Sequence, residues 1–401
     1  MFKINAISFL ILIMISCAAK DNQNPISVHE KQEPIICGAE RTDAYLHNLT
    51  DKKIGIVANH TSKIGDTHLV DSLLSLDIKI QAIFAPEHGF RGTADAGEII
   101  KDGKDIKTGL PVISIYGNNK KPKPEQLQGI DLMIFDIQDV GARFYTYISS
   151  MHYVMEACAE QNIPLLILDR PNPNGNLVDG PVLNPEYSSF VGMHPVPIAH
   201  GMTIAEYASM INGEKWLANG IQCDLELILC ENYAHNMPYA LPIPPSPNLP
   251  NNRSIELYPS ICLFEATDLS VGRGTNMQFQ IIGHPTLETI CDFTFTPVPN
   301  EGSKYPKHKN TKCYGYDLRT NNELFPKTVG KLNLNYLLKI YNAFPNKDDF
   351  FISASFFDKL AGGTKLREQL ISGKTEAEIR NSWEKALDAF KIKRESYLLY
   401  E

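Results

Sequence analysis

The chain has 401 residues, of which 43% are hydrophobic and 21% are charged, and its formal net charge at pH 7 is −8. At about one domain per 150 residues, this length predicts two or three domains. The apolar fraction excludes a chain that is largely disordered or collagen-like, and the acidic balance without a basic block argues against a nucleic-acid-binding protein.

The N-terminus has the pattern of an export signal. Lys3 precedes an apolar run at 6–15, which is too short to span a membrane comfortably. The run ends in Met-Ile-Ser-Cys17, which resembles a bacterial lipoprotein box. We interpret 1–17 as a lipoprotein signal peptide with Cys17 as the lipidated residue, and 18–36 as a flexible tether. The alternative is an ordinary secretory signal with an incidental cysteine.

This interpretation predicts an exported lipoprotein that is anchored to a membrane through Cys17. The expected location is the periplasm or outer membrane of a Gram-negative bacterium. The seven other cysteines form no C-x-x-C pair and no zinc-binding spacing. Cys158 is expected to be a buried thiol, and a disulfide between Cys223 and Cys230 is compatible with the sequence.

Residues 37–195 have the pattern of an α/β domain, a Rossmann-like parallel sheet. Five short aliphatic runs, apolar on both faces, alternate with helical or loop segments. The runs are 53–58, 79–84, 112–116, 131–136 and 164–169. Helices are expected at 66–76, with Asp66 as the N-cap, and at 150–161. The chain lacks the glycine patterns of dinucleotide-binding and P-loop proteins, so those two classes lose their main support.

Residues 196–401 are expected to form a smaller α+β domain packed over the edge of the sheet. Thr203 and Glu206 have the spacing of a capping box in a helix at 202–216. Strands are expected at 224–229 and 277–282, and an amphipathic helix at 375–390. The proline-rich segment, residues 240–252, contains five prolines and is expected to be a rigid connector or the wall of a groove.

Side chains that can carry chemistry follow four of the five predicted strands. The segments concerned are 59–62, 86–92, 136–145 and 169–175. In open parallel sheets, ligands bind beyond the carboxyl ends of the strands. The sequence therefore predicts a functional crevice at this edge.

Glu87 is the strongest candidate for a general acid, because a Glu after a proline at a strand end can be partly desolvated, which raises its pKa. His88 could orient Glu87, donate to a substrate hydroxyl or bind a metal. Asp136 and Asp139 offer the second carboxylate of a glycosidase, unless an acetamido group of the substrate takes part. One of these two is expected to hold the turn at Gly141. The alternative role for Glu87 is helix capping or an ion pair.

A second group of residues is expected to bind the substrate. Asp169 suits a sugar hydroxyl, Arg143 an anionic group or the nearby carboxylates, and Arg273 either a carboxylate or merely a tight turn between two glycines. The full set is Asn59, Arg91, Gln138, Arg143, Tyr145, Asp169, Arg170, Asn172 and Arg273.

A metal-dependent hydrolase is a rival interpretation. Its ligands would come from His60, Glu87, His88, Asp136, Asp139 and His200. The chain lacks H-x-H, H-E-x-x-H and D-x-D spacings, so this signal is weak. A serine hydrolase lacks its G-x-S-x-G elbow.

Four motifs carry a resemblance to a known family. They are PEHGFRG at 86–92, FDIQDVGARFYTY at 135–147, DRPNP at 169–173 and SVGRGT at 270–275. With these motifs the chain resembles the exo-β-N-acetylmuramidase family of glycoside hydrolases, formerly a domain family of unknown function. The resemblance runs from about Gly38 to the C-terminus.

The resemblance implies a Rossmann-like domain followed by a smaller domain, with the active site in the cleft between them. It implies release of N-acetylmuramic acid from the non-reducing ends of peptidoglycan fragments during cell-wall turnover, without a metal or organic cofactor. The family's catalytic acid falls on Glu87, with His88 beside it. The second catalytic group stays open between Asp136, Asp139, and water or acetamido participation.

N-acetylmuramic acid carries a lactyl carboxylate, so an anion-binding arginine is required. The candidates are Arg91, Arg143, Arg170 and Arg273. A lipid-anchored sugar-binding protein without catalysis and a metal-dependent hydrolase remain as alternatives.

Overall fold

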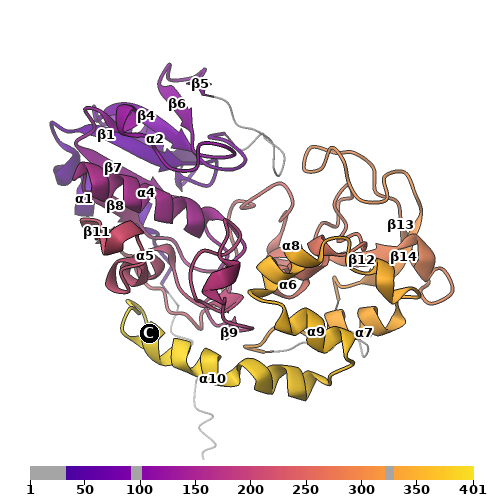
Figure 1. The fold of residues 1–401 in the computed structure, drawn as a ribbon. Coiled ribbons are helices and arrows are strands. Elements are labelled where there is room, and N and C mark those ends of the chain that lie inside the picture. Colours follow the sequence, from indigo (N-terminus) through magenta and orange to yellow (C-terminus); the bar gives the residue numbers. More distant parts are fainter. Residues whose placement is uncertain (1–32, 92–101, 321–328) are drawn as a thin grey trace, which may run out of the picture. The chain divides into compact units, whose positions relative to one another are not determined.

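In a computed structural model of the chain, seven strands form one sheet in the order β11-β8-β7-β1-β4-β6-β5 (Figure 1). Neighbouring strands are parallel except for β5, which is antiparallel to β6. The strands are β1 (Lys53–Ala58), β4 (Lys79–Ala85), β5 (Gly103–Lys104), β6 (Pro111–Ser114), β7 (Leu132–Asp136), β8 (Leu165–Leu168) and β11 (Leu225–Ile228). The five predicted strands are all confirmed.

The structure describes residues 33–91, 102–320 and 329–401, and residues 35–401 form one compact unit. The predicted signal peptide, Cys17 and most of the tether lie outside the described residues. Within those residues, no helix combines the length and the apolar character needed to cross a membrane.

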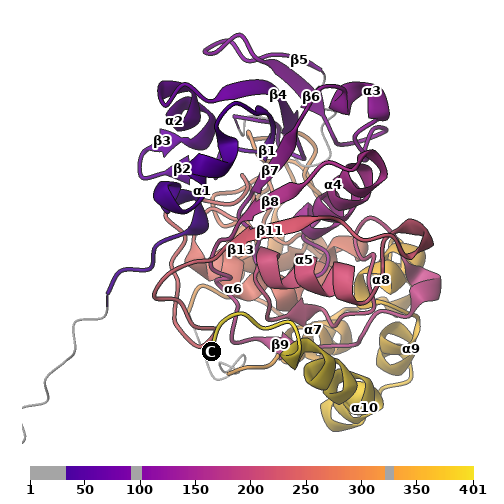
Figure 2. The same cartoon turned by 90° about the vertical axis from the view of Figure 1, so that its left-hand side faces the viewer.

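Helices cover both faces of the sheet, as Figure 2 shows. Side chains such as Phe84 and Phe135 pack with α4 (Tyr147–Gln161) and α5 (Ile204–Gly213) on one face. Their neighbours along the strands point to the other face and pack with α1 (Thr42–Leu49) and α2 (Leu69–Ser75). Burial on both faces explains why these strands are continuous apolar runs rather than alternating ones. The short helix α3 spans Pro124–Leu127.

The start of α2 differs from the prediction. Residues before Leu69 form a small hairpin of β2 (Lys63–Ile64) and β3 (Thr67–His68), which turns at Gly65 with φ of 55°. The helix is capped by the His68 ring, which accepts the N–H of Val70, so the assignment of Asp66 as N-cap was wrong. Asp66 is used in the Gly-Asp turn of the hairpin instead.

Strand β11 also lies elsewhere than expected. It was predicted as part of the smaller domain, but it pairs with β8 at the edge of the first sheet. The segment that begins at residue 196 therefore contributes both a strand and helix α5 to the sheet's own layers. The capping box of Thr203 and Glu206 at the start of α5 is confirmed.

The C-terminal part, residues 252–401, contains a second, antiparallel sheet in the order β12-β14-β13. Its strands are β12 (Ile281–His284), β13 (Phe293–Phe295) and β14 (Cys313–Asp317). β12 begins four residues later than predicted, after a turn in which Phe279 has φ of 54°. The helices are α6 (Asn252–Ile261), α7 (Asn335–Ala343), α8 (Ala354–Ala361), α9 (Lys365–Ile371) and α10 (Glu376–Glu395).

Helix α10 runs back from the C-terminal part toward the first sheet (Figure 1). A two-stranded ribbon of β9 (Val178–Asp179) and β10 (Ala199–His200) lies on its path, and Arg380 of α10 pairs with Asp179 at 2.8 Å. The seven described cysteines are buried and free, which confirms Cys158 as a buried thiol and leaves Cys223 and Cys230 unpaired.

Candidate active site

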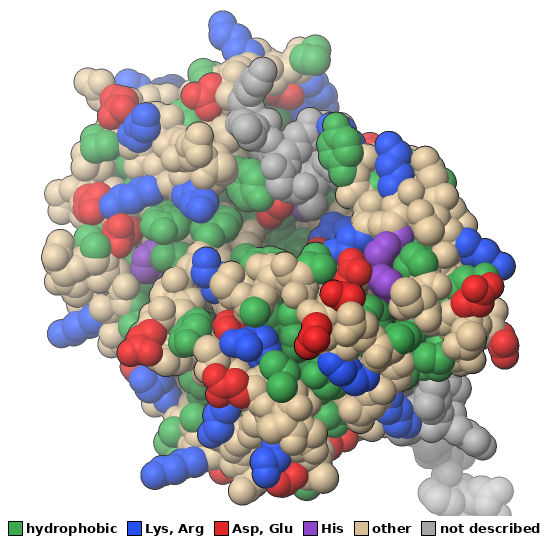
Figure 3. All heavy atoms as spheres, turned by 45° about the vertical axis from the view of Figure 1, so that its right-hand side comes forward, with side chains coloured by type: hydrophobic (Ala, Val, Ile, Leu, Met, Phe, Trp, Pro, Cys, Tyr) green, Lys and Arg blue, Asp and Glu red, His purple; other side chains and the backbone are tan. Residues whose placement is uncertain are grey.

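A pocket lies beyond the carboxyl ends of the parallel strands, where the first sheet faces the C-terminal part. Figure 3 shows a hollow between the two, with hydrophobic side chains at its base and Lys or Arg side chains at its rim. The lining residues come from several segments that lie far apart in the sequence. They are Glu87, His88, Phe144, Tyr145, Thr146, Tyr147, Ser246, Asn248, Leu249, Tyr258, Arg273 and Phe279.

Glu87 is half-buried in the wall of this pocket, directly after β4. Its Oε1 accepts a hydrogen bond from Tyr116 Oη at 2.9 Å, and its Oε2 accepts one from Thr146 Oγ1 at 3.2 Å. Burial and the nearby charge of Glu87 raise the pKa of Tyr116, so this phenol stays a donor. The carboxylate is thus held in one orientation by two hydroxyl groups.

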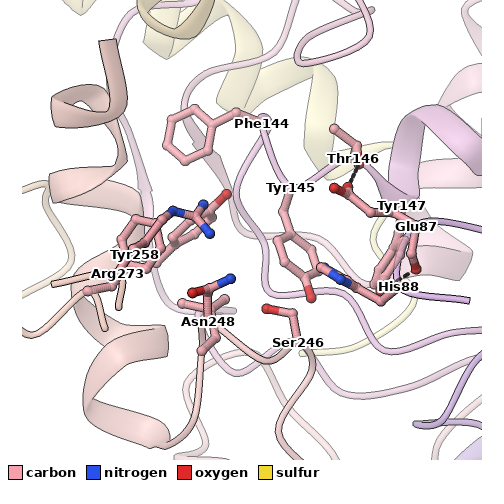
Figure 4. A pocket seen from close by; sticks show the side chains of 12 residues that line it. Glu87, His88, Phe144, Tyr145, Thr146, Tyr147, Ser246, Asn248, Tyr258 and Arg273 are labelled. Carbon is pink, nitrogen blue, oxygen red and sulfur yellow. Dashed lines mark hydrogen bonds between the residues drawn. The ribbon is translucent and has the colours of Figure 1, made fainter. Parts of the chain in front are cut away.

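His88 follows in a strained backbone conformation. Its φ is 69°, in the left-handed region that residues other than glycine seldom adopt, and its side chain is buried. The N–H of Gly89 closes the turn by donating to the carbonyl of Pro86 at 3.0 Å. Such strain is concentrated at functional sites, where it aims a side chain. Here it places His88 beside Glu87 (Figure 4).

Two tyrosines form the floor between the walls. The Tyr145 and Tyr147 rings meet edge to face with centroids 5.0 Å apart. Tyr145 Oη donates to the carbonyl of Pro245 at 2.9 Å, and Tyr147 Oη accepts from Asn59 Nδ2 at 2.9 Å. Asn59 therefore lies behind Tyr147 and not in the pocket itself. The proline-rich segment forms part of the wall through Ser246, Asn248 and Leu249, as predicted.

Arg273 lies across the pocket from Glu87, with Tyr145 between them (Figure 4). Its Nε and Nη2 lie 2.9 and 2.8 Å from Oε2 of Glu265, and its guanidinium carbon lies 5.0 Å from the ring centre of Phe279. Burial alone would lower the pKa of Arg273, but the facing Glu265 raises it above its usual value. Gly272 has φ of 82°, and a Cβ there would meet the carbonyl of Met277 at 2.6 Å.

Asp136 and Arg170 lie behind the pocket and bind each other. Both side chains are buried, and Arg170 Nε and Nη2 donate to the two oxygens of Asp136 at 2.6 and 2.9 Å. Arg170 also donates to the carbonyl of Lys63 at 3.0 Å. This pair fastens the ends of β7 and β8 to the β2 hairpin.

Asp139 is the carboxylate that holds the Gly141 turn. Its Oδ2 accepts the N–H of Gly141 at 2.7 Å, whereas Oδ1 is buried with no hydrogen-bond partner among the described residues. Burial raises the pKa of Asp139 to about 7. His200 Nε2 lies 3.9 Å away, but burial lowers the pKa of His200 to about 3, so the imidazole is neutral.

Three more predicted binding residues fix loops behind the pocket. Gln138 Nε2 donates to the carbonyls of Asp139 and Pro171, both at 2.8 Å. Asn172 Nδ2 donates to the carbonyl of Met202 at 3.0 Å. The carboxylate of Asp169 accepts the N–H of Ala205 at 3.0 Å and the hydroxyl of Tyr400 at 2.6 Å.

Two of the candidate arginines are engaged elsewhere. Arg143 is fully buried and donates to the carbonyls of Pro181, Val196 and Leu360 at 2.6–2.8 Å. Burial lowers its pKa to about 9. Arg91 pairs with Asp71 at 3.4 Å and Asp105 at 2.8 Å. Of the nine predicted binding residues, Tyr145 and Arg273 line the pocket.

Family models match almost all of the described chain. A model described as exo-β-N-acetylmuramidase NamZ, N-terminal, matches residues 54–253, and its C-terminal counterpart matches residues 256–400. The chain belongs to the NamZ family. A curated relative, peptidoglycan β-N-acetylmuramidase NamZ of Bacillus subtilis (strain 168), is 41% identical over 383 residues, which cover 89% of each chain.

Two solved structures of DUF1343 family proteins from Bacteroides fragilis NCTC 9343 are similar to this NamZ family chain. The first is 45% identical with a TM-score of 0.83, and the second is 28% identical with a TM-score of 0.78. Each match covers 92% of this chain and 99% of the other. The two NamZ family models meet within the first turns of α6, so the first of them includes β11.

The rival metal site is not assembled in this NamZ family member. Its proposed ligands, among them His60 and His200, do not converge as a group of three in the described residues. His60 Nε2 instead lies 2.8 Å from the carbonyl of Pro244 in the proline-rich segment.

Several residues that line the pocket or bind Glu87 escaped the sequence analysis. Thr146 and Tyr147 lie inside the longest NamZ motif, and Tyr116 ends the third predicted run, so a signal for all three was present. Tyr258 and Asn248 carried no signal of their own. Their place depends on how the C-terminal part and the proline-rich segment pack against the sheet.

Proposed function

We propose that this chain releases N-acetylmuramic acid from the non-reducing ends of peptidoglycan fragments, with Glu87 as the general acid. One observation carries the choice of Glu87: it is the only carboxylic acid among the described residues that line the pocket. Membership of the NamZ family supports the reaction class, a glycosidase.

In this mechanism, protonated Glu87 gives its proton to the glycosidic oxygen as the bond to the anomeric carbon breaks, and the leaving sugar departs with that proton. A water oxygen then bonds to the anomeric carbon, and the proton that this water loses returns to the Glu87 carboxylate. The carboxylate left behind accepts the hydroxyls of Tyr116 and Thr146. These two hydrogen bonds hold the carboxylate in one orientation while the proton is transferred. His88 and Tyr145 line the same pocket and contact the sugar.

The proposal keeps Asp136 and Asp139 out of contact with the substrate. Asp136 uses both oxygens on Arg170, and Asp139 is buried beneath the Gly141 turn. Removing either would disturb the loops that present the pocket rather than remove a reacting group.

Arg273 is our candidate for the lactyl carboxylate. The other three candidate arginines point their guanidinium groups at carbonyls or carboxylates outside the pocket. Arg273 meets Glu265 through Nε and Nη2, so Nη1 faces away from that pair. A guanidinium fork suits a carboxylate, which supports recognition of N-acetylmuramic acid over N-acetylglucosamine.

The test uses the chain from residue 18 onward and its Glu87→Gln variant. Each is incubated with a chromogenic β-N-acetylmuraminide and with the matching β-N-acetylglucosaminide, with and without EDTA. We expect turnover of the muraminide alone, insensitive to EDTA, and a loss of at least about 10²-fold in Glu87→Gln.

Glu384→Gln serves as the control, because this exposed glutamate of α10 is remote from the pocket lining. It should retain full turnover. Binding of the muramyl sugar without turnover by the unaltered chain would contradict the proposal and favour a sugar-binding protein. Turnover that EDTA abolishes would favour a metal-dependent hydrolase.

We also propose that the chain is exported and anchored through lipid on Cys17, where it meets cell-wall fragments for recycling. The apolar run at 6–15 and the Cys17 box support this. Expressed at full length in a Gram-negative host, the protein should partition into detergent, and Cys17→Ala should move it to the aqueous phase. Cys37→Ala, at the next cysteine, should stay in detergent; detergent partitioning of Cys17→Ala would contradict the anchor.

A further inference from the structure

Asp268, His284 and His308 converge in the C-terminal part, and none of them lines the pocket. Asp268 follows the 3-10 helix at Cys262–Ala266, His284 ends β12, and His308 lies in the loop before β14. One ligand atom from each lies within 4.8 Å of the others. Within the described ranges, this is the only such group of three His, Cys, Asp or Glu side chains.

Both imidazoles face the same carboxylate. His284 Nε2 lies 2.9 Å from Asp268 Oδ2, and His308 Nε2 lies 3.8 Å from Asp268 Oδ1. His308 Nε2 also lies 2.5 Å from the main-chain oxygen of Asp268. The two rings meet edge to face with centroids 4.5 Å apart and planes at 90°. The two imidazole nitrogens thus face the two oxygens of one carboxylate.

We propose that Asp268, His284 and His308 bind a divalent transition-metal ion, with Zn²⁺ as the best fit. Zinc bonds of about 2.0–2.2 Å in a tetrahedral site place neighbouring ligand atoms about 3.4 Å apart. The two distances to the carboxylate, 2.9 Å to Oδ2 and 3.8 Å to Oδ1, fall on either side of that value. To bind an ion through Nε2, His308 exchanges its contact with the main-chain oxygen of Asp268 for the metal bond.

The outer partner of His284 suits a metal ligand. His284 Nδ1 lies 2.7 Å from Thr286 Oγ1 and 3.1 Å from Thr286 N. In the metal-bound form, Nδ1–H donates to the Thr286 hydroxyl, which leaves the lone pair of Nε2 for the ion. In the metal-free form, Nδ1 accepts the Thr286 N–H and Nε2–H donates to Asp268. Thr286 serves both tautomers without moving.

The site is open on one side. The Asp268 side chain is 34% exposed and those of His284 and His308 are 9% and 16% exposed. A surface cavity beside it is lined by Asp268 and His284, together with Asp348 and Asp349. Water can therefore complete the coordination of an ion held by three protein ligands.

A metal ion at this site would stabilise the loop that carries Glu265, which pairs with Arg273 of the pocket wall. Asp268 lies three residues after Glu265, the partner of Arg273. Lys307, next to His308, donates to the carbonyls of Phe264, Glu265, Thr267 and Leu269. The ion would join the loop at 264–269 to β12 and to the loop at 303–311. Its role is to stabilise this region, and it takes no part in bond cleavage.

The experiment titrates chelator-stripped protein, residues 18–401, with Zn²⁺ alone in a calorimeter and follows the Tm in parallel. We expect one equivalent of Zn²⁺ to bind with a Kd at or below the micromolar range and to raise the Tm by about 2 °C or more. His308→Gln and Asp268→Asn should each weaken binding at least tenfold. His47→Gln, which alters an exposed histidine of α1, should bind Zn²⁺ as the unaltered chain does.

Thr286→Val provides a variant that keeps all three ligands and should weaken binding less than the ligand variants do. The Tm of each variant in chelator shows whether it folds. The proposal would be overturned if the unaltered chain bound no Zn²⁺ tightly. It would also be overturned if folded His308→Gln and Asp268→Asn bound Zn²⁺ as tightly as the unaltered chain does. Muraminide turnover should persist in EDTA, so failure of this metal site and failure of the proposed function give separate results.

Discussion

Asp139 is a single residue whose burial makes stability depend on pH. Its pKa is about 7 in the folded chain and about 3.9 in an unfolded one, so the folded state binds more protons between these values. The free energy of unfolding should therefore fall as the pH rises from about 4 to about 7. Asp169, whose pKa burial raises to about 6, acts in the same direction.

The Asp139→Asn variant isolates the contribution of Asp139 to the pH dependence of stability. Its amide does not titrate, but the amide oxygen can still accept the N–H of Gly141. Urea unfolding at pH 5 and pH 8 should show a loss of stability with pH that is about 2 kcal/mol smaller in the variant than in the unaltered chain. Equal losses in the two proteins would show that Asp139 is not abnormally protonated.

Arg273 gives the residue-scale test of substrate choice. Arg273→Lys keeps a positive charge against Glu265 but loses the planar fork. The kcat/KM for the muraminide should fall about tenfold or more, while the affinity for N-acetylglucosamine, which lacks the lactyl group, stays unchanged. Arg319→Lys, at an exposed pair with Asp317, should leave both values unchanged. Equal losses on both sugars would contradict a lactyl contact.

Sequence reasoning reached some site residues and not others for a physical reason. Glu87 and Arg273 lie in turns that line the cleft. Glu87 follows a predicted strand and Arg273 lies between two glycines, so the sequence indicates a turn at each position. Arg143 has the same charge and lies in the strongest motif, yet its guanidinium binds the carbonyl of Leu360, 217 residues away. The sequence carries no signal that separates an arginine that binds carbonyls from one that binds a ligand.

At the scale of elements, the positions of the strands could be predicted from the sequence, but which strands pair with one another was harder to predict. The runs of β1, β4 and β7 are apolar on both faces because helices cover both. That pattern, in runs of four to six residues, is typical of buried parallel strands. Pairing of β11 with β8 depends on a connection through α5, and no local pattern distinguishes this edge from a strand of the smaller sheet.

The C-terminal tail is an element that fastens α10 to the first sheet. Tyr400 donates to Asp169, and the N–H of Leu399 donates to Glu206 at 2.8 Å. Tyr400→Phe leaves a buried carboxylate oxygen of Asp169 without this donor, which should lower the free energy of unfolding by about 1–3 kcal/mol in urea. Tyr305→Phe, at a tyrosine that is 89% exposed, should change it little. A loss in both variants alike would contradict the role of this contact.

At the scale of the whole chain, the pocket and the main core belong to both parts at once. One hydrophobic cluster runs from Val57 of β1 to Phe390 of α10. A fragment of residues 35–253 would lack almost half of the residues of this cluster and would expose side chains that pack against them. We therefore expect it to aggregate or to lack a cooperative unfolding transition. A soluble monomeric fragment with a sharp transition would show that the first sheet folds alone.

The contacts of Asp169 with two segments that lie far apart in the sequence have a consequence for biosynthesis. The main-chain oxygen of Asp169 accepts the N–H of Gly38 at 2.8 Å, and its carboxylate accepts the hydroxyl of Tyr400. Because synthesis proceeds from the N-terminus, Tyr400 leaves the ribosome long after Gly38 and Asp169, so the contact with Tyr400 forms late. A prematurely terminated chain cannot make that contact, and its unfinished edge stays open to proteases that remove incomplete products.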